Sequence, residues 1–307
     1  MNATSYKDTW DSRALSAEAA MAAVDGSTDE SIVQHTGRWT ADQVQAALDI
    51  GPEDRVLELG CGVGRIGREL TGRCASWTGV DISENMLRHA RERLADRPNA
   101  HFHQLNRSKL EMLEDASIDK AYSIAVFCHM DKEDLYLYLQ DLHRVVRPGG
   151  LIFVETWNLV HPIGWRRWEY EPLVWDGADQ KQRKDIARNQ FCTPEEFELY
   201  VRKAGFQPLA NYAESQSVQI VAGRDLDEER MASEHARLER DAARIAYSPL
   251  YAEFFGLFVD VIFGKITARQ MLEQVDAAAP AEEVDLFRPY LLALWRKNAE
   301  LWGEPPA

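Results

Sequence analysis

The sequence predicts an α/β protein in which helices cover both faces of a mainly parallel sheet. From Asp54 onward, short apolar runs alternate with helical segments, an order that favours parallel strands. A glycine-rich turn joins the first run to a helical segment beginning at Arg65, and the last two runs follow one another like a hairpin. We therefore expect seven strands, at residues 55–59, 76–80, 100–104, 119–126, 150–156, 206–213 and 216–222.

Residues 1–50 precede the alternating region, and we expect them to form a helical cap. Residues 16–24 are rich in alanine, a strong helix former, whereas residues 25–29 have the composition of a loop. Thr40 and Gln43 have the spacing of a capping box, so a further helix is expected to begin at Thr40.

Helices are also expected between the strands, at residues 84–96, 132–146 and 194–204. The last of these has the clearest start, because Thr193 can serve as N-cap and Pro194 suits the first helical position.

Residues 224–307 extend beyond the expected sheet. Residues 224–244 carry mixed charges and indicate a solvated helix. Residues 249–266 are apolar almost all round, so this helix must be buried, either on its own domain or across a dimer interface. We favour a homodimer through the C-terminal helices, because a large exposed apolar patch is a liability on a soluble monomer.

The charge balance argues against nucleic acid and anionic membranes as partners. The 307-residue chain has a net charge of −15 and a pI near 5.0, whereas such partners require a basic surface. The first residues lack an apolar signal core, and the most apolar stretch, 254–264, is too short to span a bilayer and contains Asp260. The four cysteines show no C-x-x-C pairing, which favours reduced thiols in a cytoplasmic protein.

The glycine-rich turn carries the strongest functional signal. Glu58 lies inside the end of the first strand, Gly60, Gly62 and Gly64 follow it at every second position, and Asp81 ends the next strand 23 residues after Glu58. A carboxylate at the Asp81 position suits ribose hydroxyls. A dinucleotide would place pyrophosphate against this turn, where Glu58 would repel it. S-adenosylmethionine has no phosphate and carries an amino group and a sulfonium, so this pattern favours it over NAD.

These motifs resemble those of class I S-adenosylmethionine-dependent methyltransferases. Residues 79–83 are similar to the second motif of that family, and residues 147–151 to the turn before its fifth strand. The likeness covers roughly residues 35–223. It implies a Rossmann-like, seven-stranded methyltransferase sheet at residues 51–223, preceded by the cap (1–50). Two features depart from the common pattern of the family: a tryptophan-rich insertion at residues 157–190, expected to contact the substrate, and the helical extension at residues 224–307.

The resemblance implies a set of cofactor-binding residues. Glu58 and the three glycines would surround the methionine part and ribose, Asp81 would hold the ribose hydroxyls, and Ile82 would pack on adenine. Asn106 stands where many relatives have Asp, and it would meet the adenine edge together with Arg107. Arg38 is expected to pair with the cofactor carboxylate, with a surface arginine as the alternative. The end of the fourth strand, including Phe127, is expected to support the cofactor.

Candidate catalytic residues follow the fourth and fifth strands. His129 can act as a general base because the histidine pKa lies near neutrality, or it can be a packed histidine. Glu155, Thr156 and Trp157 end the fifth strand and are candidates to face the acceptor. His101 and His103 share a strand face but lack a third ligand at a telling spacing, so no metal is expected.

The insertion contains Trp175 and four further aromatic residues that are candidates to line an acceptor pocket or simply to pack the insertion itself; these four are Trp157, Trp165, Trp168 and Tyr170. We expect a small soluble metabolite as acceptor. Bacterial enzymes that S-methylate methionine have about this size and organisation, so methionine is the specific hypothesis. N- or O-methylation of another metabolite is the alternative. A nicotinamide-dependent oxidoreductase and a non-catalytic scaffold are the alternatives from other classes.

Overall fold

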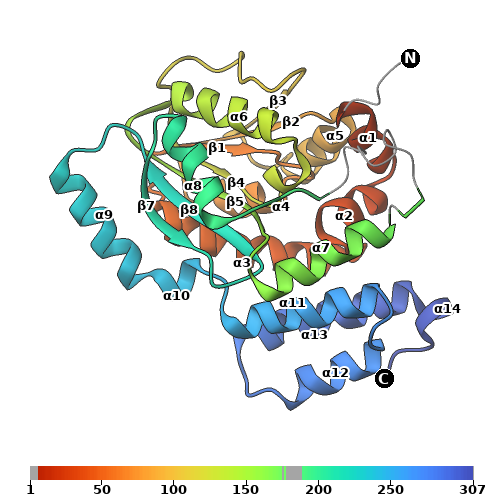
Figure 1. Cartoon of the computed structure of the whole chain (residues 1–307). Coiled ribbons are helices and arrows are strands. Elements are labelled where there is room, and N and C mark those ends of the chain that lie inside the picture. Colours follow the sequence, from red (N-terminus) through yellow and green to blue (C-terminus); the bar gives the residue numbers. More distant parts are fainter. Residues whose placement is uncertain (1–5, 175, 178–188, 307) are drawn as a thin grey trace.

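The computed structural model describes residues 6–174, 176–177 and 189–306, and it is organised around one eight-stranded sheet (Figure 1). The strand order is β3-β2-β1-β4-β5-β8-β7, and β6 pairs with the end of β5. The strands are β1 Arg55–Leu59, β2 Ser76–Asp81, β3 Ala100–Gln104, β4 Ile118–Ser123, β5 Val146–Asn158, β6 Phe191–Cys192, β7 Gln207–Tyr212 and β8 Ser217–Gly223.

The sheet has the topology predicted from the sequence. β1 pairs in parallel with both β2 and β4, so the strand order reverses at β1, and ligands of α/β sheets bind at the carboxyl ends of strands beside such a reversal. β8 runs antiparallel to β5 and β7, which confirms the expected hairpin. The predicted number of seven strands is one too low. Strand β6 has only two residues, too few to give a pattern in the sequence.

Helices cover both faces of the sheet, and a separate group follows it in the chain. They are α1 Tyr6–Arg13, α2 Ala17–Asp25, α3 Glu30–Leu48, α4 Arg65–Leu70, α5 Glu84–Arg93, the short 3₁₀ helix η1 Phe127–His129, α6 Lys132–Val145, α7 Pro162–Val174, α8 Pro194–Lys203, α9 Glu228–Arg240, α10 Ala242–Ile245, α11 Pro249–Ile262, α12 Ala268–Ala277, α13 Glu282–Lys297 and α14 Ala299–Trp302. Apolar side chains of α6 and α8 form the core on one sheet face. Those of α3, α4, α5 and α9 form the core on the other.

Two helix starts show how local signals compete. Thr193 caps α8 as predicted, accepting a 3.2 Å hydrogen bond from the Glu196 backbone. The predicted start at Thr40 is wrong, because α3 already begins after Asp29, whose carboxylate accepts from the Ser31 backbone at 2.9 Å. Thr40 then lies inside the helix, and its hydroxyl donates to the Thr36 carbonyl. No proline interrupts residues 30–48, so the earlier cap determines the helix.

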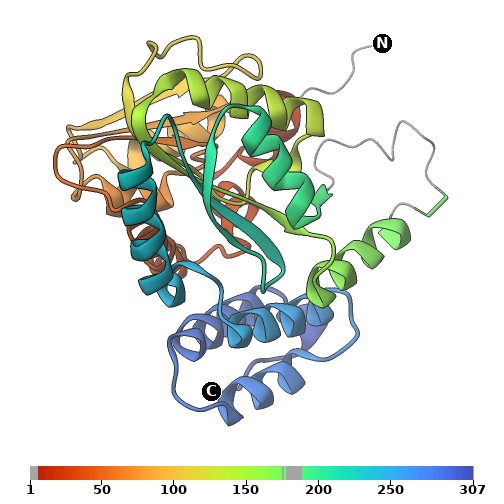
Figure 2. The same ribbon diagram turned by 60° about the vertical axis from the view of Figure 1, so that its left-hand side comes forward.

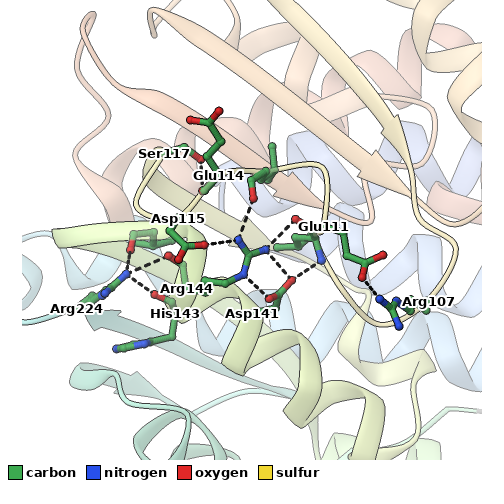
Figure 3. Close-up of polar contacts among 12 residues, drawn as sticks. Arg107, Glu111, Glu114, Asp115, Ser117, Asp141, His143, Arg144 and Arg224 are labelled. Carbon is green, nitrogen blue, oxygen red and sulfur yellow. Dashed lines mark hydrogen bonds and ion pairs between the residues drawn. The ribbon is translucent and has the colours of Figure 1, made fainter.

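Two arginine side chains form hydrogen bonds at the end of α6 (Figure 3). One of them ties the segment between β3 and β4 to this end of the helix. Arg144 binds the Asp141 and Asp115 carboxylates, each at 2.7 Å, and donates to the Leu110 carbonyl at 2.9 Å. Arg224 donates to the carbonyl groups at the end of α6, including that of His143 at 2.6 Å. These bonds satisfy the last carbonyls of the helix and hold the chain just before β4 at the sheet edge where β4 and β5 begin, opposite the edge that faces the cavities.

The C-terminal helices pack onto the rest of the chain. Figures 1 and 2 show α11–α13 as a layer beside α3 and α7. Phe254 is buried in the cluster that α11, α12 and α13 form, and Trp39 of α3 packs against this cluster. The Tyr290 hydroxyl donates a 2.5 Å hydrogen bond to the Asp25 carbonyl at the end of α2. Residues 249–266, predicted to be buried, therefore pack against other parts of the same chain.

One stretch of the described residues, Ala242–Ile262, has the length and apolar composition of a membrane-crossing helix. It consists of two helices, because α10 ends at Ile245 and Ser248 begins α11 by accepting from the Tyr251 backbone at 3.0 Å. Its apolar side chains pack against other helices of the protein.

In the described part of the insertion after β5, aromatic residues of α7 pack against one another and against Phe263, which follows α11. Trp165 stacks on Trp168 with ring centroids 4.9 Å apart, and Trp165 is about half exposed. Tyr170 stacks on Phe263. These three insertion aromatics therefore follow the packing alternative, whereas Trp175 lies outside the described residues.

Candidate functional site

The turn between β1 and α4 is shaped by glycines with positive φ. Gly60, Gly62 and Gly64 have φ of 77°, 51° and 72°, a region that side chains disfavour. A Cβ on Gly60 would lie 2.4 Å from Val126, and one on Gly62 would lie 2.7 Å from Val24. The turn therefore leaves no room for side chains, and its backbone faces the space beneath α2 and the segment after β4.

Asp81 is held at the end of β2 by backbone donors. Its Oδ2 accepts from the Gly62 N–H at 2.8 Å, and its Oδ1 accepts from the Ser83 N–H at 2.9 Å. Burial raises the pKa of Asp81 to about 6. Helix α5 is capped by Ser83, which accepts from the Met86 N–H at 3.1 Å, and not by Asp81. The Asp81 carboxylate is thus fixed against the glycine turn.

Glu58 ends a chain of buried hydrogen bonds. The Trp77 indole donates to the Tyr122 hydroxyl at 3.1 Å, and that hydroxyl donates to Glu58 at 2.5 Å. Burial raises the pKa of Glu58 to about 8. A cation beside Glu58 would favour its charged form, so this carboxylate suits the positively charged part of a ligand.

A cavity, here called the glycine-turn cavity, opens beside these groups. Its lining includes Glu58, Gly60, Gly62, Asp81, Ile82, Leu105, Ser108 and Tyr138, together with Tyr6, Trp10 and Val24 of the N-terminal helices. Asp11 ties α1 to this place by accepting from the Ser83 hydroxyl at 2.6 Å. The N-terminal helices thus form one wall of the cavity.

A second cavity, here called the aromatic cavity, adjoins the first. Five residues line both cavities: Val24, Arg65, Ile124, Ala125 and His129. The walls of the aromatic cavity come from α3, the end of β5 and the C-terminal helices. Their aromatic residues are Trp39, Trp157, Tyr247, Tyr251, Phe255, Phe258, Phe287 and Tyr290. The two cavities therefore meet at the carboxyl end of β4, close to the reversal of strand order.

Two buried carboxylates and one guanidinium face the aromatic cavity. Glu155 accepts from Gln219 at 3.0 Å and from the Tyr247 hydroxyl at 2.9 Å, and burial raises its pKa to about 7. The Arg65 Nε lies 3.8 Å from the Asp25 carboxylate, and Arg65 donates to the Thr40 hydroxyl at 3.1 Å. Burial also raises the pKa of Asp25.

His129 lies in η1, where the two cavities meet. Its Nδ1 is buried without a hydrogen-bond partner in the protein, and the Trp10 ring lies edge-on with centroids 5.2 Å apart. Burial, and to a lesser degree the Arg13 and Arg167 charges, lowers the His129 pKa to about 4. The imidazole is therefore neutral at neutral pH and has a nitrogen free to accept a proton or a hydrogen bond.

The structure brings some of the predicted site residues together and leaves others apart. Glu58, Gly60, Gly62, Asp81, Ile82 and His129 line the glycine-turn cavity, and His129, Glu155, Thr156 and Trp157 line the aromatic cavity. Arg38 lines neither. It points outward, half exposed, with Glu69 at 3.8 Å, because it lies on the face of α3 away from Thr40 and Arg65.

Four further predicted residues also stay outside both cavities. Asn106 and Arg107 are exposed, and Arg107 pairs with Glu111, since the chain turns outward after Leu105. Phe127 is fully buried against Phe197 beneath η1. Gly64 begins α4, where a Cβ would meet Leu94 of the neighbouring helix.

Several residues of the site escaped prediction. The signal in the sequence that could have identified Arg65 is its position directly after the glycine turn. Asp25 was assigned to a loop, and Tyr247, Tyr251 and Tyr290 lie in the tail, where their apolar neighbours suggested an interface. Their convergence depends on how the C-terminal helices dock, which local sequence does not reveal.

Comparison with known proteins agrees with this geometry. Residues 56–150 match a family model described as a methyltransferase domain. Malonyl-[acyl-carrier protein] O-methyltransferase of Serratia marcescens is 36% identical over 107 residues, covering 34% of this chain and 39% of the relative. The same enzyme of Pseudescherichia vulneris is 36% identical over 141 residues, covering 45% and 53%. The 2-methyl-6-phytyl-1,4-hydroquinone methyltransferase of Synechocystis is 32% identical over 108 residues, covering 35% and 33%.

The matched region thus spans about half or less of the length of these curated relatives. Among solved structures, a chain from the complex between the Haloferax volcanii Trm112 methyltransferase activator and a methyltransferase superposes with a TM-score of 0.53. It is 17% identical and covers 67% of this chain and 97% of its own length, a likeness that shows the fold.

Proposed function

Because the chain belongs to the class I S-adenosylmethionine-dependent methyltransferase superfamily, we propose that it methylates a small-molecule acceptor. The glycine-turn cavity would hold the cofactor and the aromatic cavity the acceptor. The observation that carries this proposal is the junction of the two cavities at Arg65, Ala125 and His129. A methyl donor on one side of such a junction can meet an acceptor on the other.

The residues present fit the cofactor. The positive-φ glycines give a close backbone cradle that a Cβ would fill, and Asp81 offers a fixed carboxylate for ribose hydroxyls. Glu58 suits the cationic methionine part, and Ile82 and Leu105 offer apolar contact for the adenine. When bound there, S-adenosylmethionine supplies an activated methyl group.

The protein's own part in the reaction is to position the acceptor and exclude water. Holding two reacting groups in line can contribute about 7–11 kcal/mol to lowering a barrier. The N-terminal helices wall the glycine-turn cavity and the C-terminal helices wall the aromatic cavity. Both groups of helices can exclude water. His129 and Glu155 face the acceptor side, where either can take a proton from an acceptor that must lose one. Trp157 adds an aromatic face to the same wall.

Formation of S-adenosylhomocysteine tests this proposal. The purified protein is incubated with labelled S-adenosylmethionine and a metabolite panel, and products are read by mass spectrometry. Binding of the cofactor without turnover of any acceptor would favour the alternative from another class, a non-catalytic scaffold. Absence of cofactor binding by calorimetry would remove the proposal.

Methionine is the specific acceptor that we propose to test first. Its zwitterion would meet both signs of charge in the aromatic cavity, which holds Arg65 as well as Asp25 and Glu155. S-methylmethionine is the expected product. Methylation of an amine or hydroxyl metabolite in the same panel, with methionine unchanged, would favour an N- or O-methyltransferase instead.

A cytoplasmic homodimer is a further proposal. The four cysteines are all buried and unpaired, which supports a reducing compartment. For association, the exposed apolar side chains Ile262 and Leu301 on the C-terminal helices are the candidates for a contact between copies. Light scattering of the wild type and of Leu301→Asp tests it: a dimer should become a monomer, and a wild type of monomer mass would remove the homodimer.

A further inference from the structure

The aromatic cavity has an uneven charge balance. Two carboxylates line it, Asp25 and Glu155, and both are almost completely buried. Arg65 is the one Lys or Arg among the described residues that line it, and His129 is neutral. A ligand carrying only negative charge would add another anion to this set. A ligand carrying a positive charge would balance it.

The unpartnered polar atoms of the cavity are mainly acceptors. Asp25 Oδ2 and Gln216 Oε1 are buried and accept no hydrogen bond from the protein. Thr156 Oγ1 is also buried without a partner, and Thr156 and Gln216 are each 2% exposed. His129 Nδ1 and the donor Trp157 Nε1 are also buried without a partner. Buried polar atoms are normally satisfied, so the carboxylate and amide oxygens among these five atoms point to a ligand that donates hydrogen bonds.

Aromatic rings surround the same space. Trp39 stacks with Tyr247 and Tyr251, with centroids 5.8 Å and 5.1 Å away, and Tyr247 also binds Glu155. Ring faces attract cations, and the attraction grows where water is excluded. Aromatic rings beside a buried carboxylate are therefore the surroundings that favour an organic ammonium group over a neutral hydroxyl of the same size.

We propose that the acceptor bound in the aromatic cavity carries a protonated amine, recognised by Asp25, Glu155 and the surrounding aromatic rings. The assignment of this ligand as the acceptor rests on the proposed function, whereas the preference for an amine is a property of the cavity itself. Methionine meets the requirement through its α-ammonium group. An amine that is itself methylated also meets it on binding, and must then give its proton to His129 or Glu155 before its lone pair can take the methyl group. An acceptor with carboxylates or phosphates and no amine does not meet it.

Matched pairs of small ligands test the preference. Phenethylamine, hexylamine and cyclohexylmethylamine are titrated against 2-phenylethanol, hexanol and cyclohexylmethanol by calorimetry, with and without saturating S-adenosylhomocysteine. The best amine should bind about 10-fold or more tightly than its alcohol, as expected for charge-assisted hydrogen bonds. If no amine binds more tightly than its alcohol, the proposal is wrong.

Variants assign the preference to the two carboxylates. Asp25→Asn and Glu155→Gln keep the side-chain shape and should each reduce the amine preference several-fold. Asp276→Asn, at an exposed ion pair with Arg288, serves as the matched control. Unchanged amine preference in both cavity variants would overturn the proposal.

Titration of S-adenosylhomocysteine into the same proteins separates the two proposals. Retained affinity shows that a variant is folded and that its glycine-turn cavity is intact. If the wild type fails to bind S-adenosylhomocysteine, the proposed function fails, while the amine titrations without it still decide the charge preference of the aromatic cavity.

Discussion

The hydroxyl of Tyr247 donates a 2.9 Å hydrogen bond to Glu155, joining the segment before α11 to the end of β5 across 92 residues of chain. Both side chains are buried, and both line the aromatic cavity. The C-terminal extension is thus part of the site, since it supplies a direct partner for a carboxylate that the sheet presents.

Tyr247→Phe should weaken the acceptor side of the site and spare the cofactor side. The Tyr247 hydrogen bond holds the Glu155 pKa down, so its loss raises that pKa, and Glu155 stays protonated to higher pH. Turnover at pH 7 should fall about fivefold for a bond worth about 1 kcal/mol. The acid limb of the pH–rate profile should move to higher pH, with S-adenosylhomocysteine affinity unchanged. A profile identical to the wild type would contradict the link between the two residues.

Glu58 should make the unliganded protein less stable as pH rises. Burial raises its pKa from 4.5 to about 8, so between these values the folded state binds more protons than the unfolded state. Stability then falls as pH rises through this window, by on the order of 5 kcal/mol for this group. Glu58→Gln should lose distinctly less stability between pH 5 and pH 9, measured by urea unfolding. Parallel curves for the two proteins would show that Glu58 is ionised in the fold.

The strands and the glycine turn were predictable because their signals are local. All seven predicted strands form, including residues 100–104, where two histidines and a glutamine interrupt the apolar pattern. The turn required glycine at Gly60 and Gly62, where φ is positive, so sequence and backbone geometry coincide. Asp81 and Glu58 then fall beside the turn, because strands of a parallel sheet end at one edge.

Whether the remaining candidate residues reach the site depends on which way their helix or loop faces, and the sequence does not show this. Arg38 was the cation predicted to meet the cofactor and Arg65 was not considered, but the packing of α3 on α4 turns Arg38 outward and Arg65 inward. Phe127 follows β4 as predicted, yet a phenyl ring next to the α8 core gains more from burial against Phe197 than from facing a cavity. The aromatic walls from α11 and α13 required knowledge of tertiary docking.

Asp81→Asn should weaken S-adenosylmethionine binding by about 10-fold, since charge-assisted hydrogen bonds contribute about 1.5–3 kcal/mol. The amide keeps the side-chain size but has only one oxygen to serve the Gly62 and Ser83 N–H groups. The melting temperature is therefore measured alongside affinity, to separate loss of fold from loss of binding. Wild-type affinity by calorimetry would remove Asp81 from the cofactor site.

The last prediction concerns the cation that meets the cofactor carboxylate. Arg65 is the one Lys or Arg among the described residues lining the glycine-turn cavity, and its side chain is 14% exposed, against 55% for Arg38. Arg65→Gln should weaken S-adenosylhomocysteine binding about 10-fold or more, as expected when a buried charge-assisted pair is lost. Arg38→Gln should change it less than about twofold, as is usual for an exposed ion pair.

Arg65 also binds Thr40 and lies near Asp25, so its loss can act through the N-terminal helices instead of through the ligand. Methylthioadenosine distinguishes the two routes, because it keeps the nucleoside and lacks the amino-acid carboxylate. If Arg65 pairs with that carboxylate, Arg65→Gln weakens S-adenosylhomocysteine binding and leaves methylthioadenosine binding unchanged. Equal weakening of both ligands would show that Arg65 acts by holding the helices in place, and a larger effect of Arg38→Gln would restore Arg38 as the cofactor's partner.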